Sequence, residues 1–247
     1  MVAKLKDILS SSNNIVFFGG AGVSTESNIP DFRSEKGLYQ GDNGYKYSPE
    51  EMLSHSFFVS HKEDFYKFYK EKMIYKDAKP NAAHYALADL ESMGKLRAVI
   101  TQNIDGLHQE AGSRNVLELH GTVKDNYCTK CSEHFDLDYV MESKTLVPKC
   151  NICGGDIKPN VVLYEESLDE GVIKSAISYI SNAEVLIVGG TSLVVYPAAG
   201  LINYFNGKYL VLINKSVTSF DNIADLVIKD KVGKVLGEAV SDLKKGY

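Results

Sequence analysis

The chain has 247 residues, 44% of them hydrophobic, which is enough to bury one large core and leave room for a small additional module. Its net charge of -5 and pI near 5.7 exclude a general attraction for polyphosphate backbones, so we expect no general nucleic-acid binding. The same acidity favours positively charged, lysine-bearing substrates.

Neither a membrane span nor a secretion signal is visible in the sequence. No apolar run approaches the roughly 18 residues that a transmembrane helix requires. Residues 1–7 are charged and lack the apolar segment of a signal peptide. We therefore expect a cytoplasmic protein with no membrane association.

The first half of the chain predicts a helix at residues 3–11, a strand at 15–18 and a loop at 34–48. Two helices follow at 61–76 and 82–92, and then two strands at 98–100 and 116–119. The first two helices are amphipathic, and the strands are short apolar runs typical of buried strands. The loop is polar and carries three glycines, so we expect it to be mobile.

The second half alternates strands with helices. Strands begin near Val161, Val185, Leu210 and Asp225, and helices span residues 169–181, 198–205 and 232–243. This alternation predicts an α/β fold built on a doubly wound, mainly parallel sheet of the Rossmann type.

A polar, cysteine-bearing block interrupts the alternation and predicts an inserted small module. We assign residues 1–33, 78–121 and 160–247 to the sheet domain. Residues 34–77 form a loop and helical module in this assignment. Residues 122–159 form the inserted module, which we expect to be a zinc ribbon.

The four cysteines of this module have the spacing of a metal site. Cys128 and Cys131 form one C-x-x-C pair, Cys150 and Cys153 form a second, and eighteen residues separate the two pairs. Two such turns present four thiolates to one tetrahedral zinc ion. Four sulfurs close the coordination shell, so we expect a structural zinc that contributes on the order of 10 kcal/mol to folding. The alternatives are a redox dithiol and free buried cysteines.

Polar side chains follow two of the predicted strands. Asn103 and Asp105 come after the run at 98–100, and His120 follows the run at 116–119. In an open α/β sheet, ligands bind outside the carboxyl ends of the strands, so we expect a site here. The alternative is that Asp105 caps a short helix and that His120 is a satisfied turn residue.

Glycine-rich turns follow the strands at 15–18 and 185–188. Gly20 and Gly22 would let the backbone approach a phosphate at a helix N-terminus. The pattern lacks a third glycine, so a turn without a ligand is the alternative. Phe32 and Arg33 follow on a loop that could cover a bound nucleotide, or could form a capped turn with a surface ion pair.

Taken together, these motifs resemble the sirtuin family, and the chain looks like a bacterial or archaeal sirtuin. Besides the cysteine pairs, the match runs in order through Gly20-Ala21-Gly22-Val23-Ser24, Ile29-Pro30-Asp31-Phe32-Arg33, Thr101-Gln102-Asn103-Ile104-Asp105, Leu119-His120-Gly121, Gly190-Thr191-Ser192-Leu193 and Ile213-Asn214. The resemblance implies an NAD-dependent protein-lysine deacetylase. Such an enzyme transfers the acyl group from lysine to ADP-ribose and releases nicotinamide.

The resemblance also assigns roles to single residues. His120 is the general base and Asn103 the second catalytic residue. The implied NAD contacts are Gly20, Ala21, Gly22, Thr25, Phe32, Arg33, Gln102, Asn103, Ile104, Asp105, Gly190, Thr191, Ser192, Asn214, Lys215, Lys231 and Val232. An acetyl-lysine peptide would add as a strand beside Val162, Leu163, Tyr164, Val194 and Val195.

Departures from the family pattern concern the turns and the acyl pocket. Asn28 and Glu165 stand where the family commonly has glycine. Succinyl-removing members carry a tyrosine and, three residues on, an arginine; here these positions are Tyr66 and Tyr69. We expect both tyrosines to contact substrate, although both could simply face the core. Because tyrosine lacks the forked cation that binds a carboxylate, we expect an acetyl or other neutral acyl group.

Other functions compatible with these residues remain open. One is mono-ADP-ribosyl transfer, and another is removal of a longer neutral acyl group. A binding module that senses NAD or depends on zinc is a third, and NAD-dependent hydride transfer is a fourth. His120 favours deacylation over ADP-ribosyl transfer, since only deacylation needs a base after the first step.

Overall fold

The structure is a computed structural model and describes residues 1–34, 37–39 and 44–244. The predicted mobile loop at residues 34–48 lies partly outside these residues, and its mobility stays a prediction. Among the described helices, none combines the length and the apolar composition that crossing a bilayer requires.

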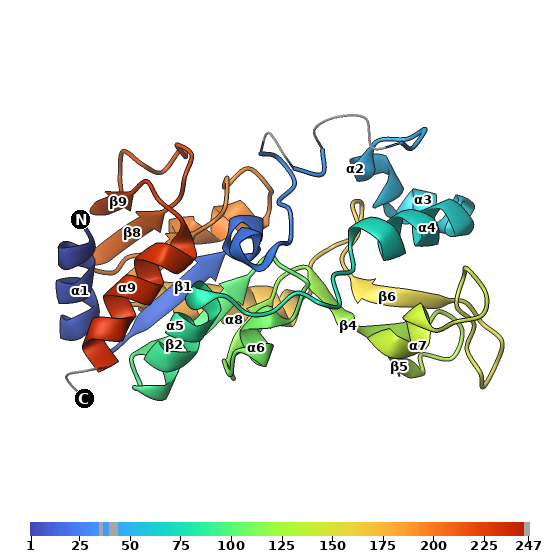
Figure 1. Cartoon of the computed structure of the whole chain (residues 1–247), viewed down its shortest axis with the longest axis horizontal. Helices are drawn as coiled ribbons and strands as arrows, with labels where there is room; N and C mark the ends of the chain where they lie inside the picture. The colour runs from blue at the N-terminus through green and yellow to red at the C-terminus, as the bar shows by residue number, and fades with distance from the viewer. Residues whose placement is uncertain (35–36, 40–43, 245–247) are drawn as a thin grey trace.

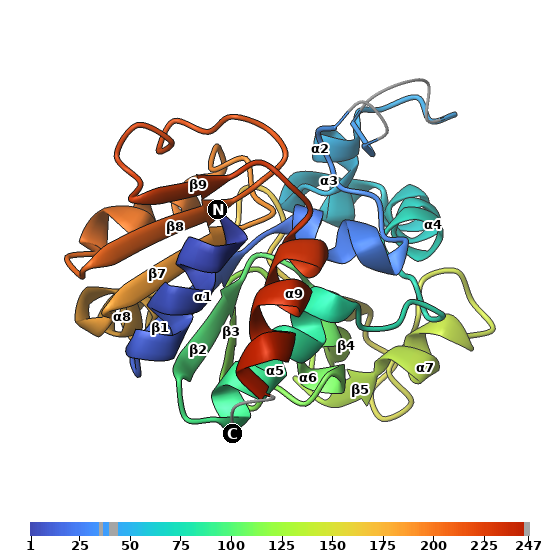
Figure 2. The same cartoon turned by 60° about the vertical axis from the view of Figure 1, so that its left-hand side comes forward.

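A six-stranded parallel sheet forms the larger part of the molecule (Figures 1 and 2). Its strand order is β3-β2-β1-β7-β8-β9. The strands are β1 (Ile15–Gly19), β2 (Leu96–Thr101), β3 (Val116–Glu118), β7 (Val185–Gly189), β8 (Tyr209–Ile213) and β9 (Leu226–Ile228). The order reverses between β1 and β7, which is the point where doubly wound sheets bind ligands. This confirms the predicted fold class.

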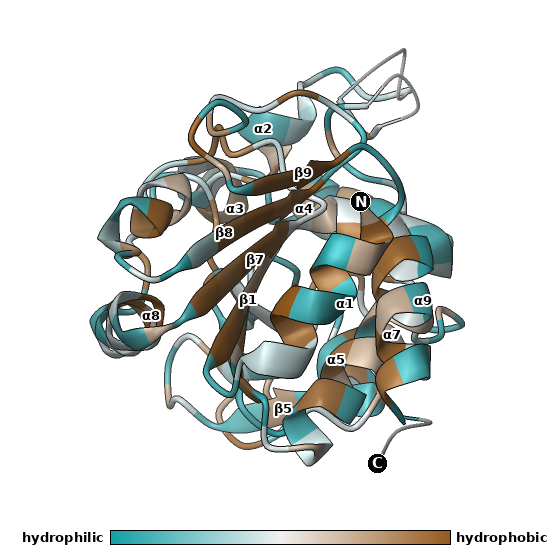
Figure 3. Ribbon diagram, turned by 90° about the vertical axis from the view of Figure 1, so that its left-hand side faces the viewer, coloured by the Kyte–Doolittle hydropathy of each residue, from teal (hydrophilic) through white to brown (hydrophobic). Residues whose placement is uncertain are grey.

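Helices cover both faces of the parallel sheet, as Figure 3 shows. One face carries α1 (Val2–Ser11), α5 (Ala82–Ser92) and α9 (Val232–Lys244). The opposite face carries α8 (Glu170–Asn182) and the 3₁₀ helix η2 (Ala198–Tyr204). Short helices η1 (Ala21–Ser27) and α6 (Leu107–Glu110) follow β1 and β2.

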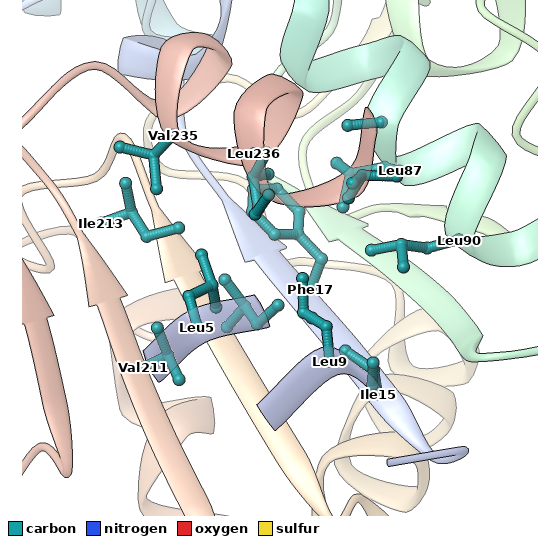
Figure 4. Close-up of a cluster of buried hydrophobic side chains, with 14 of the residues drawn as sticks. Leu5, Leu9, Ile15, Phe17, Leu87, Leu90, Val211, Ile213, Val235 and Leu236 are labelled. Carbon is teal, nitrogen blue, oxygen red and sulfur yellow. The ribbon is translucent and has the colours of Figure 1, made fainter. Parts of the chain in front are cut away.

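Alternate residues of β1 supply the two hydrophobic cores. Ile15 and Phe17 join the core beneath α1, α5 and α9, whereas Val16 and Phe18 join the core beneath α8 and η2. Successive side chains of a strand point to opposite faces, so a continuous apolar run is what a doubly covered strand needs. Figure 4 shows Phe17 among leucines of the three helices.

The remaining elements form the other end of the molecule in Figure 1. A three-stranded antiparallel sheet has the order β5-β4-β6, with β4 (Gly121–Cys128), β5 (His134–Asp136) and β6 (Ile157–Val161). Beside it lie α2 (Pro49–Met52), α3 (His55–Ser60), α4 (Lys62–Lys72) and α7 (Leu137–Met141). A third hydrophobic core joins these helices to the small sheet.

Three sequence expectations need correction. The strand expected near Val161 is β6 and pairs antiparallel with β4, so it belongs to the small sheet and not to the parallel one. β3 is half-buried and not buried, because it lies at an edge of its sheet. The helix expected at 61–76 ends at Lys72.

Candidate active site

A cavity of about 920 Å³ lies where the carboxyl ends of the parallel strands face the small sheet and the helices beside it. Its lining comes from η1, from the turns after β2, β7 and β8, and from the segment after β6. Every residue that the resemblance assigns to NAD lies in this lining, together with His120. The fold therefore brings together side chains that are far apart in the sequence.

Ser24 connects the two polar residues that follow β2. Its hydroxyl donates a hydrogen bond of 2.6 Å to Asp105 Oδ2 and accepts one of 3.0 Å from Asn103 Nδ2. The other oxygen of Asp105 accepts from the backbone N–H of Leu107 at 2.9 Å. Asp105 thus takes part in the polar cluster and also accepts from the first N–H of α6, as the capping alternative expects, while its role toward a ligand stays a prediction.

Sequence reasoning assigned no role to Ser24. The residue is only 1% exposed, yet it lines the cavity and orients Asn103 and Asp105. The available signal was its position: a hydroxyl inside the glycine-rich turn that follows the first strand.

His120 is half-buried at the end of β3 and is held in one orientation. Its Nδ1 lies 3.0 Å from the carbonyl oxygen of Gln102. In the neutral ring, Nδ1–H donates this bond, which leaves Nε2 as the basic nitrogen. Burial lowers the pKa of His120, and the hydrogen bond to Gln102 only partly opposes this effect. The imidazole is therefore neutral and basic at neutral pH.

The backbone next to His120 is fixed by Gly121. This glycine has φ of 73°, and a Cβ there would lie 2.1 Å from the carbonyl oxygen of Asn160. The carbonyl of His120 accepts a hydrogen bond of 2.9 Å from the N–H of Val162. His120 and the predicted peptide-binding segment are therefore joined directly through the backbone.

The glycine turns after β1 and β7 pack backbone against backbone. The N–H of Gly22 donates to the carbonyl of Gly190 at 2.8 Å. A Cβ on Gly22 would lie 2.8 Å from the Cα of Gly190. Gly190 has φ of 61°, and a Cβ there would lie 2.4 Å from the N of Val23. This packing requires these glycines whether or not a phosphate also binds to them.

Thr191 links the turns after three strands. Gln102 Nε2 donates to its hydroxyl at 3.1 Å, and Asn214 Nδ2 donates to its carbonyl at 2.9 Å. Gln102 follows β2, Thr191 follows β7 and Asn214 follows β8. A polar network held in this way keeps its geometry before any ligand binds.

The two departures from the glycine pattern keep the backbone shape of glycine. Asn28 has φ of 62° and Glu165 has φ of 75°, both left-handed. Asparagine adopts this conformation more readily than most residues. Glu165 is held there by Ser56, whose backbone N–H and hydroxyl both donate to its carboxylate at 2.9 Å.

The residues predicted to bind substrate divide into two groups. Val162, Leu163, Tyr164, Val195 and Tyr69 line the cavity. Val194 and Tyr66 are not part of the lining. Val194 is 56% exposed beside it, and Tyr66 is fully buried with its hydroxyl bonded to the Ile157 carbonyl. For Tyr66 the structure therefore agrees with the core-facing alternative, because packing against β6 turns this residue away from the cavity.

The four cysteines are clustered as in a structural zinc site. Their sulfur atoms all lie within 4.8 Å of one another. Cys128 Sγ and Cys153 Sγ are 3.4 Å apart, and Cys131 Sγ and Cys150 Sγ are 3.7 Å apart. Zinc–sulfur bonds of about 2.3 Å in a tetrahedron require sulfur separations of roughly 3.8 Å. Disulfide bonds would require about 2.05 Å, and all four cysteines are free.

Comparison with known proteins places the chain among close relatives. A family model described as "Sir2 family" matches residues 20–197. An NAD-dependent protein deacetylase of Clostridium acetobutylicum is 65% identical over 235 residues, which are 95% of this chain and 96% of that protein. One of Clostridium tetani is 64% identical over 243 residues, covering 98% of both.

Solved structures match over the whole fold. A structure of Sir2 with a p53 peptide and NAD+ superposes with a TM-score of 0.87 at 40% identity and covers 99% of both chains. A structure of Sir2 bound to an acetylated peptide has a TM-score of 0.86 at 40% identity and covers 100% of this chain and 98% of that one.

We predict that the purified protein holds one zinc ion per chain. Replacing Cys131 by serine removes one thiolate ligand, so the variant should lose the metal and most of the stability of the small sheet. Metal analysis by mass spectrometry and thermal unfolding measure the two effects. Thr145→Ser, in the same part of the chain but outside the cysteine cluster, should keep the metal. Well under one equivalent of zinc in the unaltered protein would contradict the assignment.

Proposed function

The chain belongs to the Sir2 family, and we propose that its cavity removes acetyl groups from protein lysines with NAD as co-substrate. In this reaction the acyl group passes from lysine to ADP-ribose, and nicotinamide is released. The observation that carries the proposal is that one cavity gathers every implied NAD contact, the base His120 and the peptide-binding segment. A relative that is 65% identical over nearly its full length bears the name of this activity.

The NAD side of the cavity divides into two parts in this proposal. Thr191 and Ser192, with the backbone of the glycine turns, would hold the phosphates and ribose. Asn103 and Asp105 would hold the nicotinamide carboxamide, because a carboxylate accepts from its NH₂ group and an amide can bond to its carbonyl. Ser24 keeps both side chains oriented for this task. When bound, NAD supplies the electrophilic ribose carbon and the nicotinamide leaving group.

His120 would act as the general base through Nε2. Its Nδ1 is committed to the carbonyl of Gln102, so Nε2 is the nitrogen that can take a proton from a ribose hydroxyl. Burial keeps the ring neutral and able to accept that proton at neutral pH. This base favours deacylation over simple ADP-ribosyl transfer, which does not need one after nicotinamide leaves.

The substrate side would bind an extended peptide by strand addition. Val162 to Tyr164 and Val195 line the cavity and could pair with the peptide backbone on its two sides. Backbone pairing reads little of the peptide sequence, so we propose a broad set of acetyl-lysine proteins as partners. The four unpaired cysteines fit a reducing compartment, and we propose that the protein works in the cytoplasm.

The first prediction concerns the base itself. His120→Ala should lower the turnover of an acetyl-lysine peptide by at least about a hundredfold, because proton removal from the ribose hydroxyl is lost. NAD binding and thermal stability should change little. His134→Ala is the matched control, since His134 is an exposed histidine on β5 that is not part of the cavity lining. Near-normal turnover in the His120 variant would refute the assignment.

The pH dependence gives a second prediction. The neutral imidazole is the active form, and the pKa of His120 is lowered from 6.5. Turnover should therefore persist as the pH falls through 6.5 and should be lost only when it passes the lowered pKa. The test is kcat against pH, with zinc content and ADP-ribose affinity measured over the same range to separate other acid effects. A midpoint at or above pH 6.5 would count against a buried base.

A third prediction concerns the acyl group. Because Tyr69 occupies the position of the carboxylate-binding arginine, acetyl and butyryl peptides should turn over at least about tenfold faster than a succinyl peptide. Butyryl is the size control, since it has the same chain length as succinyl without the charge. A clear preference for the succinyl peptide would overturn this assignment.

A further inference from the structure

Two tyrosine hydroxyls meet across the cavity. Tyr39 Oη and Tyr164 Oη share a hydrogen bond of 2.7 Å, although the residues are 125 positions apart in the sequence. Tyr39 lies in the segment that follows η1, on the proposed NAD side. Tyr164 follows β6, on the proposed peptide side. Both residues line the cavity, so this bond joins its two functional sides.

On the NAD side, Tyr39 is fixed against the two residues proposed to cover the nucleotide. Its ring centroid lies 5.3 Å from that of Phe32, and the guanidinium carbon of Arg33 lies 5.3 Å from the Tyr39 ring centroid. The N–H of Tyr39 donates to the carbonyl of Phe32 at 2.9 Å. A displacement of Tyr39 would therefore be felt by both Phe32 and Arg33.

On the peptide side, the backbone of Tyr164 is fixed at both of its polar groups. Its N–H donates to the carbonyl of Leu53 at 2.9 Å, and its carbonyl accepts from the N–H of His55 at 3.0 Å. Tyr164 also directly follows Val162 and Leu163, which we propose to pair with the peptide. The position of its hydroxyl is therefore set by the substrate side of the cavity.

The hydrogen bond persists over the physiological pH range. Burial raises the pKa of Tyr39 well above its usual value, and the hydroxyl of Tyr164 raises it further. The phenol stays protonated, so the bond does not behave as a pH switch. A net contribution typical of one such hydrogen bond corresponds to roughly a threefold to tenfold change in an equilibrium constant.

We propose that Tyr164 is a positioning residue that acts through Tyr39 to hold Phe32 and Arg33 over the NAD site. The proposal rests on the proposed function, which assigns Phe32 and Arg33 to NAD. A peptide that adds beside Val162 and Leu163 fixes Tyr164 more firmly and thereby tightens binding on the NAD side. Linkage requires the converse, so a ligand on the NAD side tightens peptide binding by the same factor.

The test measures binding without turnover. ADP-ribose serves as the probe of the NAD side, because it lacks the nicotinamide leaving group and cannot support deacylation. Its affinity is measured by calorimetry with and without a saturating acetyl-lysine peptide, for the unaltered protein, Tyr164→Phe, Tyr39→Phe and the double variant. Each substitution keeps the ring and removes only the hydroxyl. Tyr85→Phe is the matched control, since Tyr85 is 51% exposed on α5.

Each single variant should bind ADP-ribose roughly threefold to tenfold more weakly, and the double variant no more weakly than either single one. The peptide should also tighten ADP-ribose binding less in these variants than in the unaltered protein. In turnover, KM for NAD should rise while kcat stays within about twofold. The control should match the unaltered protein in every measurement.

Two results would overturn the proposal. One is an unchanged ADP-ribose affinity in Tyr164→Phe. The other is a double variant whose loss equals the product of the two single losses, since the tyrosines would then act separately. Because the probe binds without reacting, either result leaves the deacetylase assignment untouched. Conversely, a protein without deacetylase turnover would not for that reason alone give either result.

Discussion

Backbone contact between the turns after β1 and β7 is the constraint on which the rest of the cavity depends. The turns meet where the strand order of the parallel sheet reverses, and Gly22 and Gly190 approach so closely that neither position has room for a methyl group. Ser24 and Thr191 lie one or two residues beyond this contact. Through them, Asp105, Asn103 and Gln102 receive their orientation. The polar cluster is therefore positioned by packing before any ligand enters.

A second backbone constraint fixes His120, the proposed base, and the proposed peptide-binding segment together. β4 begins at Gly121, next to His120, and ends at Cys128 in the cysteine cluster. β6 runs antiparallel to β4 and ends at Val161, where the proposed peptide-binding segment begins. A zinc ion held by these cysteines would stabilise one end of this strand pair, and His120 and Val162 share a hydrogen bond at the other end. The metal would then support the geometry of the cavity without taking part in the proposed reaction.

Local sequence patterns predicted the elements of the parallel sheet well. α5 has the predicted bounds, and the buried runs of β1 and β7 were recognisable because both faces of these strands are covered. The strand near Val161 was assigned to the wrong sheet, since an apolar run carries no information about its partner strand. β3 was taken as buried because its edge position depends on the strand order, which the sequence does not reveal.

The sequence indicated those residues of the candidate site that belong to a recognisable motif. It did not indicate residues whose role depends on packing between distant segments. All the implied NAD contacts line the cavity, whereas the roles of Ser24 and Tyr39 depend on contacts between distant segments. Tyr66 matched a family position, but its hydroxyl donates a hydrogen bond to the carbonyl of Ile157 in the core. The sequence marked Glu165 only as a departure from the family's glycine; the structure gives it a bond to Ser56 that supports its left-handed backbone.

The most direct test of this account is a mass measurement on the products of one reaction. An acetyl-lysine peptide is incubated with the protein in the presence and absence of NAD, and all small-molecule and peptide products are weighed. We predict deacetylated peptide, nicotinamide and O-acetyl-ADP-ribose in equal amounts, and only when NAD is present. Deacetylation without NAD, or transfer of ADP-ribose to the peptide in place of acetyl removal, would contradict it.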